Sequence, residues 1–202
     1  PALPAMPSVA PFSGDGLLIL VQQLLIGLAI GFSMKLVFTG IELAGELAAL
    51  TMGLSFASFY DPNAEADATS VSQWFGWLAV MVFVSSNLHL ALLASLTESF
   101  STLPISALPV GTGPFRMVAA YGGHLFAIGI QLALPIIAAL LVTNLALGLL
   151  TKAAPQLNLF GIGFPITIGV GFLMISVVMP YLSDPLIQAM QSALTSTGLG
   201  TH

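Results

Sequence analysis

Two carboxylates four residues apart, Glu42 and Glu46, are the residues of this sequence best suited to acid–base or ion chemistry. Residues at this spacing are neighbours on one face of an α-helix. In an apolar helix such a pair could relay ions, so it counts as a functional hypothesis. A zinc site of the HExxH type lacks ligands here, because no histidine shares the helix. Two interpretations stay open: ion coupling, or buried polar groups that face a wet interior or hydrogen-bond a neighbouring subunit. We favour the second.

Other residues with catalytic potential lack the partners that catalysis requires. Ser55 follows Gly53 and Leu54 but has no closing glycine of a nucleophile elbow. His89 and His124 are interpreted as residues that pack between helices. The chain has no cysteine, and it contains neither a phosphate loop nor a dinucleotide fingerprint. The sequence therefore predicts no enzyme, no cofactor and no metal site.

The composition predicts the class of protein that must position these residues. Hydrophobic residues make up 57% of the 202 residues and charged residues 5%, whereas soluble domains carry about 25% charged residues. Lipid accepts only backbones that satisfy their own hydrogen bonds, and the apolar runs are too long and continuous for a barrel. We expect an all-α integral membrane protein. Three basic residues are too few for a nucleic-acid patch.

The apolar runs predict five main helical segments within a single membrane domain of residues 1–202. They are residues 17–34, 36–53, 74–96, 117–150 and 159–181. Ser183-Asp184-Pro185 resembles a helix start and predicts a short amphipathic helix at residues 185–194. The chain does not begin with methionine, so we expect that N-terminal helices precede it.

Several of these helices do not suit a simple membrane anchor. Residues 117–150 would extend about 50 Å as one helix, well beyond a hydrocarbon core of roughly 30 Å, so we expect a kink at Pro135 or a helix that leaves the bilayer. A ridge of small residues (Gly40, Ala44 and Ala48) lies on the helix face away from the two carboxylates. Neither face suits lipid. This helix is therefore expected to be surrounded by protein or water.

Two irregular, ordered motifs resemble the FliR family, the flagellar type III export-gate component whose injectisome counterpart is called SctT. The first motif comprises Gly45-Glu46-Leu47, Met52-Gly53-Leu54-Ser55-Phe56-Ala57 and Asp61-Pro62. The second comprises Leu145-Ala146-Leu147-Gly148-Leu149-Leu150, Ala154-Pro155-Gln156-Leu157-Asn158 and Gly161-Ile162-Gly163-Phe164-Pro165. The sequence departs mildly from the family at Thr51, where glutamine is usual, and at Lys152, where arginine is common.

The resemblance implies a non-enzymatic subunit of the flagellar protein export gate in the bacterial inner membrane, at the flagellar basal body. FliR-like chains join FliP-like and FliQ-like subunits, and with them an FlhB-like subunit, in a helical assembly of long, kinked and broken apolar helices. Such a chain is no independent globular domain. The assembly forms the entrance channel for unfolded secreted proteins in transit, and its partners include membrane lipid and no nucleic acid.

The resemblance also implies roles for the two irregular segments. Residues 52–69 correspond to a plug in the central pore, with Met52, Gly53, Phe56, Phe59 and Asp61 as its residues. A hydrophobic constriction of this kind can block ions and yield to an unfolded chain. Residues 152–165 correspond to a helix joint that contacts partner subunits. Its residues are Lys152, Pro155, Gln156, Asn158, Gly161, Gly163 and Pro165.

Two alternatives remain beside the flagellar export gate. A secondary transporter could use Glu42 and Glu46 for ion coupling, but transporters often contain internal repeats and each motif here occurs once. The second alternative is the homologous role in a virulence injectisome.

Overall fold

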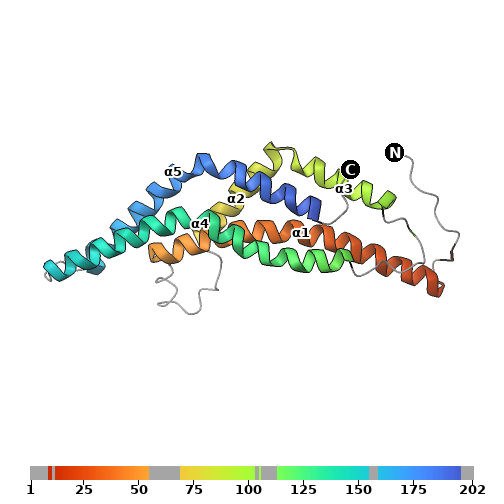
Figure 1. The fold of residues 1–202 in the computed structure, drawn as a ribbon, viewed down its shortest axis with the longest axis horizontal. Coiled ribbons are helices and arrows are strands. Elements are labelled where there is room, and N and C mark those ends of the chain that lie inside the picture. Colours follow the sequence, from red (N-terminus) through yellow and green to blue (C-terminus); the bar gives the residue numbers. More distant parts are fainter. Residues whose placement is uncertain are drawn as a thin grey trace. The chain divides into compact units, whose positions relative to one another are not determined.

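The computed structural model describes residues 9–10, 12–54, 69–102, 105, 113–154 and 159–196. Within these ranges the regular structure is helical and contains no strand, which confirms the all-α prediction. In chain order the helices are α1 (Gly14–Met52), α2 (Ser70–Ser85), α3 (Leu88–Thr102), α4 (Gly113–Ala153) and α5 (Leu159–Ser196). Figure 1 labels them and colours them along the sequence.

Three stretches of the described helices are long and apolar enough to cross a membrane. They are Gly14–Met52, Phe126–Ala153 and Gly161–Thr195. The pair α2 and α3, interrupted at Ser86 and Asn87, makes a fourth if it counts as one broken span. At 1.5 Å per residue, the 39 residues of α1 extend roughly 58 Å, nearly twice a hydrocarbon core of roughly 30 Å.

Two helices continue where the sequence pattern suggested a boundary. α1 runs unbroken through Lys35, whose exposed side chain carries its charge away from the helix without disturbing the backbone. α5 continues through Ser183-Asp184-Pro185 and contains Pro165, Pro180 and Pro185. A proline has no amide hydrogen, so each one removes a backbone hydrogen bond from the helix.

The chain divides into two compact units, and several helices contribute to both. Unit 1 comprises Pro1–Val37, Phe83–Leu125 and Ile187–His202; unit 2 comprises Phe38–Val82 and Phe126–Leu186. In unit 1, Ile26 and Ile30 of α1 pack with Leu92 of α3. Asn87 adopts a left-handed backbone (φ 57°) at the break before α3, a conformation that asparagine tolerates better than most residues.

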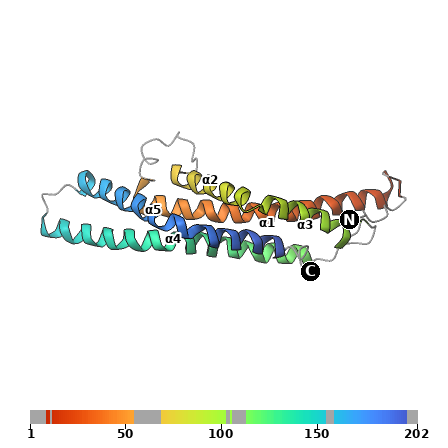
Figure 2. The ribbon, with the colours of Figure 1, turned by 90° about the horizontal axis from the view of Figure 1, so that it is seen from above.

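Unit 2 is built around the C-terminal turns of α1. Ile41, Ala44, Ala48, Ala49 and Met52 are fully buried there. Figure 2 shows these turns, in orange, beside α2. The small-residue ridge predicted from the sequence is buried. Part of it meets α4, where a Cβ added at Gly129 would lie 2.9 Å from the carbonyl oxygen of Gly40.

The backbones of α1 and α2 touch at a pair of glycines. A Cβ added at Gly45 of α1 would lie 2.7 Å from the Cα of Ser72 and 2.9 Å from the carbonyl oxygen of Val71. A Cβ added at Gly76 of α2 would lie 3.1 Å from a carboxylate oxygen of Glu42. Small residues allow helices to approach this closely in membrane proteins. The distance between α1 and α2 is therefore set by glycine at positions 45 and 76.

We expect Gly45→Ala to destabilise the protein, because the new methyl group meets backbone atoms of α2 that cannot rotate away. Overpacking of this kind costs about 1–3 kcal/mol. Gly27→Ala in the same helix is the matched control, since a Cβ there meets nothing within 4 Å. Alanine is the better helix former by about 1 kcal/mol. Thermal unfolding in detergent should give a lower Tm for Gly45→Ala and an unchanged or higher Tm for Gly27→Ala. Equal values for the two variants would contradict the close contact.

Candidate functional site

The carboxylate of Glu46 joins α1 to the residue that precedes α2. Its Oε2 atom accepts a hydrogen bond from the Thr69 hydroxyl at 3.0 Å and a longer one from the Thr69 backbone amide at 3.4 Å. The Glu46 side chain is half-buried. Hydrogen bonds to charged groups are about twice as strong as neutral ones. Glu46 therefore fixes Thr69, the residue before α2, against α1.

Thr69 also caps α2. Its Oγ1 atom accepts a hydrogen bond from the backbone amide of Ser72 at 3.3 Å, and its carbonyl oxygen accepts one from the amide of Gln73 at 3.0 Å. Threonine is a favoured residue at this position because its hydroxyl satisfies an amide that the first helical turn leaves free. The negative charge of Glu46 lies beside the positive end of the α2 dipole, which adds a favourable interaction.

Glu42 lies one turn before Glu46 in α1 and contacts α2 through both its backbone and its side chain. Its backbone carbonyl oxygen accepts a hydrogen bond from the Ser72 hydroxyl at 2.8 Å. Its carboxylate lies against Gly76, as the short distance to an added Cβ shows. Both glutamates therefore lie at the contact of α1 with α2. No group of three histidine, aspartate or glutamate side chains that could hold a metal occurs within the described ranges.

The end of α1 is fixed against α5. The Thr167 hydroxyl lies 3.1 Å from the carbonyl oxygen of Met52 and 3.0 Å from that of Phe164, so its single proton is shared between two acceptors. The Met52 side chain is fully buried. A Cβ added at Gly171 would lie 2.5–2.7 Å from three atoms of the Met52 side chain. Because Gly171 has no side chain, the Met52 side chain can occupy the space beside it.

A glycine ends α1 immediately after this contact. Gly53 has a φ of 85°, which side-chain-bearing residues rarely adopt, and its amide donates a hydrogen bond to the carbonyl oxygen of Leu50 at 3.1 Å. This is the usual role of glycine after the last helical turn. Thr51, the position that departs from the family pattern, donates to its own helix at Leu47 and Ala48. The exit of the chain from α1 is thus fixed at Gly53.

The structure describes only some of the residues predicted for the plug and the joint. Met52 and Gly53 form the end of α1, whereas Phe56, Phe59 and Asp61 lie outside the described residues. Of the joint, Pro155, Gln156 and Asn158 also lie outside them. Lys152 is exposed in the last turn of α4. Gly161, Gly163 and Pro165 belong to the first turns of α5, where Gly163 is buried and the other two are exposed.

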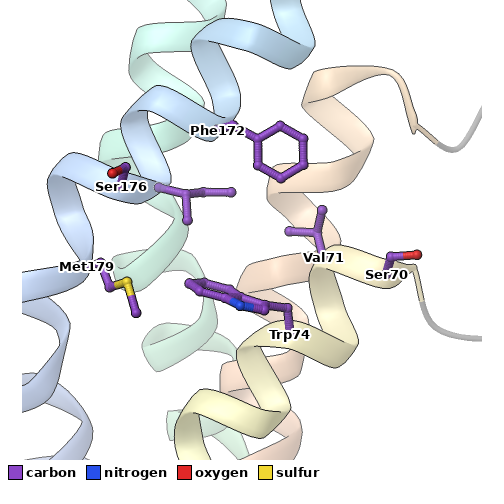
Figure 3. A pocket seen from close by; sticks show the side chains of 7 residues that line it. Ser70, Val71, Trp74, Phe172, Ser176 and Met179 are labelled. Atoms are coloured by element: carbon purple, nitrogen blue, oxygen red, sulfur yellow. The ribbon is translucent and has the colours of Figure 1, made fainter.

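A pocket of about 400 Å³ lies between α2 and α5, close to this site (Figure 3). The Trp74 indole forms one wall and Phe172 lies opposite. Apart from two serines, the lining is apolar. The lining residues are Ser70, Val71, Trp74, Phe172, Ile175, Ser176 and Met179.

Four residues of this site were not identified from the sequence: Thr69, Ser72, Thr167 and Gly171. A signal existed for Thr69, because threonine directly before an apolar helical run is a typical cap. No comparable signal existed for Thr167 and Gly171. Their role depends on contact with Met52, which lies 115 residues from Thr167 in the chain.

Comparisons with known proteins give a consistent result. Residues 1–193 match the family described as bacterial export proteins, family 1. The chain is similar to the flagellar biosynthetic protein FliR of Pectobacterium carotovorum, with 45% identity over 85% of this chain and 66% of the relative. It is 43% identical to FliR of Escherichia coli K12 over 91% of this chain and 70% of the relative. It is 36% identical to FliR of Buchnera aphidicola from Acyrthosiphon pisum over 96% of this chain and 78% of the relative. The matches to the first two relatives span about two thirds of those proteins.

Proposed function

The chain belongs to bacterial export protein family 1, and from this membership we propose that it is a non-enzymatic subunit of the flagellar type III protein export gate. The observation that carries the proposal is the match over residues 1–193, together with three relatives that bear the name flagellar biosynthetic protein FliR. These matches favour flagellar use over the injectisome and over a transporter.

The contacts of unit 2 support a structural role. Each of three polar side chains hydrogen-bonds from one helix to another chain segment: Glu46 to Thr69, Ser72 to the Glu42 carbonyl, and Thr167 to the Met52 carbonyl. Ser72 and Thr167 are buried, and buried polar groups that are satisfied in this way rigidify a fold and specify its arrangement. These groups serve to hold helices together and require no bound substrate.

The exposed apolar surface supports assembly with other subunits in a membrane. Large hydrophobic side chains are exposed along α1, α4 and α5, among them Leu24, Leu28, Leu141, Leu145 and Leu173. Apolar patches of this extent are covered by lipid or by other proteins. In this proposal, the covering partners are lipid of the bacterial inner membrane and FliP-like, FliQ-like and FlhB-like subunits at the flagellar basal body. Unfolded flagellar proteins pass through the resulting channel.

Residues 52–69 form the pore plug in this proposal, with Phe56 and Phe59 as its bulky residues and Asp61 in its polar continuation. Support comes from the described start of the segment. α1 ends at a buried methionine, and a glycine with a left-handed backbone follows it directly. A plug needs such a fixed exit, because its aromatic residues can close a pore only if they project from a constant point.

Residues 152–165 form the joint that contacts partner subunits. Support comes from Gly163, which is buried in the first turns of α5, and from exposed Lys152 at the end of α4.

Native mass spectrometry of the full-length protein tests the proposed function. The protein would be co-expressed with FliP-like and FliQ-like chains and extracted in mild detergent. We expect a heteromeric complex of defined mass that contains all three chains. A monomer or homodimer, with the partners shown to be expressed, would contradict the export-gate proposal and favour the transporter.

Deleting residues 56–59 should raise the ion conductance of the assembled gate, because the two aromatic side chains that close the pore are lost. Complex yield should not change. Conductance would be measured on purified complex in planar lipid bilayers. A Phe56→Leu/Phe59→Leu variant retains apolar bulk and serves as the control, with conductance near that of the wild type. Unchanged conductance after the deletion would overturn the plug.

Gly163→Leu should reduce the yield of complex, because a large side chain replaces a buried hydrogen at the joint. Gly169→Leu in the same helix is the control, since a Cβ there meets nothing within 4 Å. Size-exclusion chromatography of detergent extracts gives the fraction of chain in the complex. If both variants assemble as well as the wild type, residues 152–165 do not act as a joint.

A further inference from the structure

The pocket between α2 and α5 takes no part in the hydrogen bonds that join the helices of unit 2. All of its lining residues belong to that unit, so one compact body sets its shape. Val71 and Ile175 are buried. The side chains of Trp74, Phe172 and Met179 are 39%, 54% and 44% exposed. The pocket therefore combines a buried floor with an open, apolar rim.

The size and the walls of the pocket suit an aromatic group. Its volume of about 400 Å³ lies within the range of roughly 300–1,000 Å³ that is typical of binding sites. The Trp74 indole and the Phe172 ring lie on opposite sides of it (Figure 3). Aromatic rings attract one another in offset-stacked or edge-to-face arrangements. A ring placed in the pocket can make such contacts with both walls.

A polar group at one wall favours an occupant with a hydrogen-bond donor. Pro180 supplies no amide hydrogen, so the carbonyl oxygen of Ser176 lacks the donor that a helix normally provides. Ser176 and Met179 are neighbours on the helix surface and both line the pocket, which places this oxygen at the wall. A phenyl ring or an aliphatic side chain would leave it unbonded. An indole N–H or a phenol O–H can donate to it.

We propose that this pocket receives a tyrosine or tryptophan side chain of a neighbouring subunit in the assembled gate. The inference rests on the proposed function, because it requires a partner subunit. Tyrosine and tryptophan combine a ring with a donor, and they are the side chains that most often anchor protein interfaces in central pockets. The rim continues into exposed Leu173 and Val177 of α5, so a partner helix along this face would also cover the pocket.

The first test removes the aromatic walls. Phe172→Ala and Trp74→Leu should each weaken the heteromeric complex roughly tenfold, the effect expected at an interface anchor. Leu173→Ala and Trp77→Leu are the matched controls, because each lies on the same helix, is more exposed than its counterpart and does not line the pocket. Dilution of purified complex in mild detergent gives the apparent dissociation constant. Thermal unfolding of each variant alone detects a folding defect. If Trp74→Leu has one, the Phe172→Ala pair decides.

The second test identifies the occupant by photo-crosslinking. The cross-linking amino acid p-benzoylphenylalanine would replace Phe172 in the full-length protein, co-expressed with its partner subunits, and Leu173 in the control. Mass spectrometry locates the cross-linked residues. We expect position 172 to cross-link to a partner segment that contains tyrosine or tryptophan. Replacing that partner residue by phenylalanine keeps a ring and removes the donor. It should weaken the complex roughly fivefold, the factor that corresponds to one neutral hydrogen bond.

The outcomes separate this inference from the proposed function. The inference is overturned, and the export-gate function stands, if Phe172→Ala and Leu173→Ala give equal dissociation constants. Cross-links from position 172 to lipid or detergent alone, or to a partner segment without tyrosine and tryptophan, have the same meaning. A partner phenylalanine variant that binds like the wild type would also overturn the assignment, because the donor would then be unnecessary. If no heteromeric complex forms although the partners are expressed, the proposed function fails and this inference fails with it.

Discussion

Close approach of neighbouring helices at glycines around the last turns of α1 is the constraint on which unit 2 depends. α2 approaches at Gly45, α4 at Gly40 through Gly129, and α5 where Gly171 receives Met52. Helices in lipid gain little from burying apolar side chains, so van der Waals contact and hydrogen bonds must hold them together. Close approach supplies both, since it brings hydroxyl groups such as that of Ser72 within reach of neighbouring carbonyl oxygens.

Two of the polar contacts between segments of this unit lie where helices begin and end. Thr69 begins α2, Met52 ends α1, and each is bound by a side chain of a different helix. Helix termini carry backbone groups without intrahelical partners, and these are costly in apolar surroundings. The glutamate at position 46 thus has a structural role, because it accepts hydrogen bonds from the residue that begins α2. It satisfies a helix start that water would otherwise have to solvate.

The sequence predicted the helical class, the buried ridge on α1 and the family, because composition, spacing and two long motifs encode them locally. Its predictions for the plug and the joint remain proposals, as several of their residues lie outside the described ranges. Two features could not be predicted. A single lysine is compatible with a helix boundary and with a continuous helix, so the local pattern leaves the continuity of α1 through Lys35 open. The pairing of Met52 with Thr167 joins positions that only the folded chain brings together. Local pattern carries no information on such contacts.

The prolines of α5 have a consequence for what surrounds this helix. Pro180 has no amide hydrogen, so the carbonyl oxygen of Ser176 receives no bond from the residue four positions on. Ser176 lines the pocket between α2 and α5 (Figure 3). An acyl chain offers no hydrogen-bond donor. This part of α5 is therefore better suited to hydration, or to a donor from another chain, than to contact with the hydrocarbon tails of lipids.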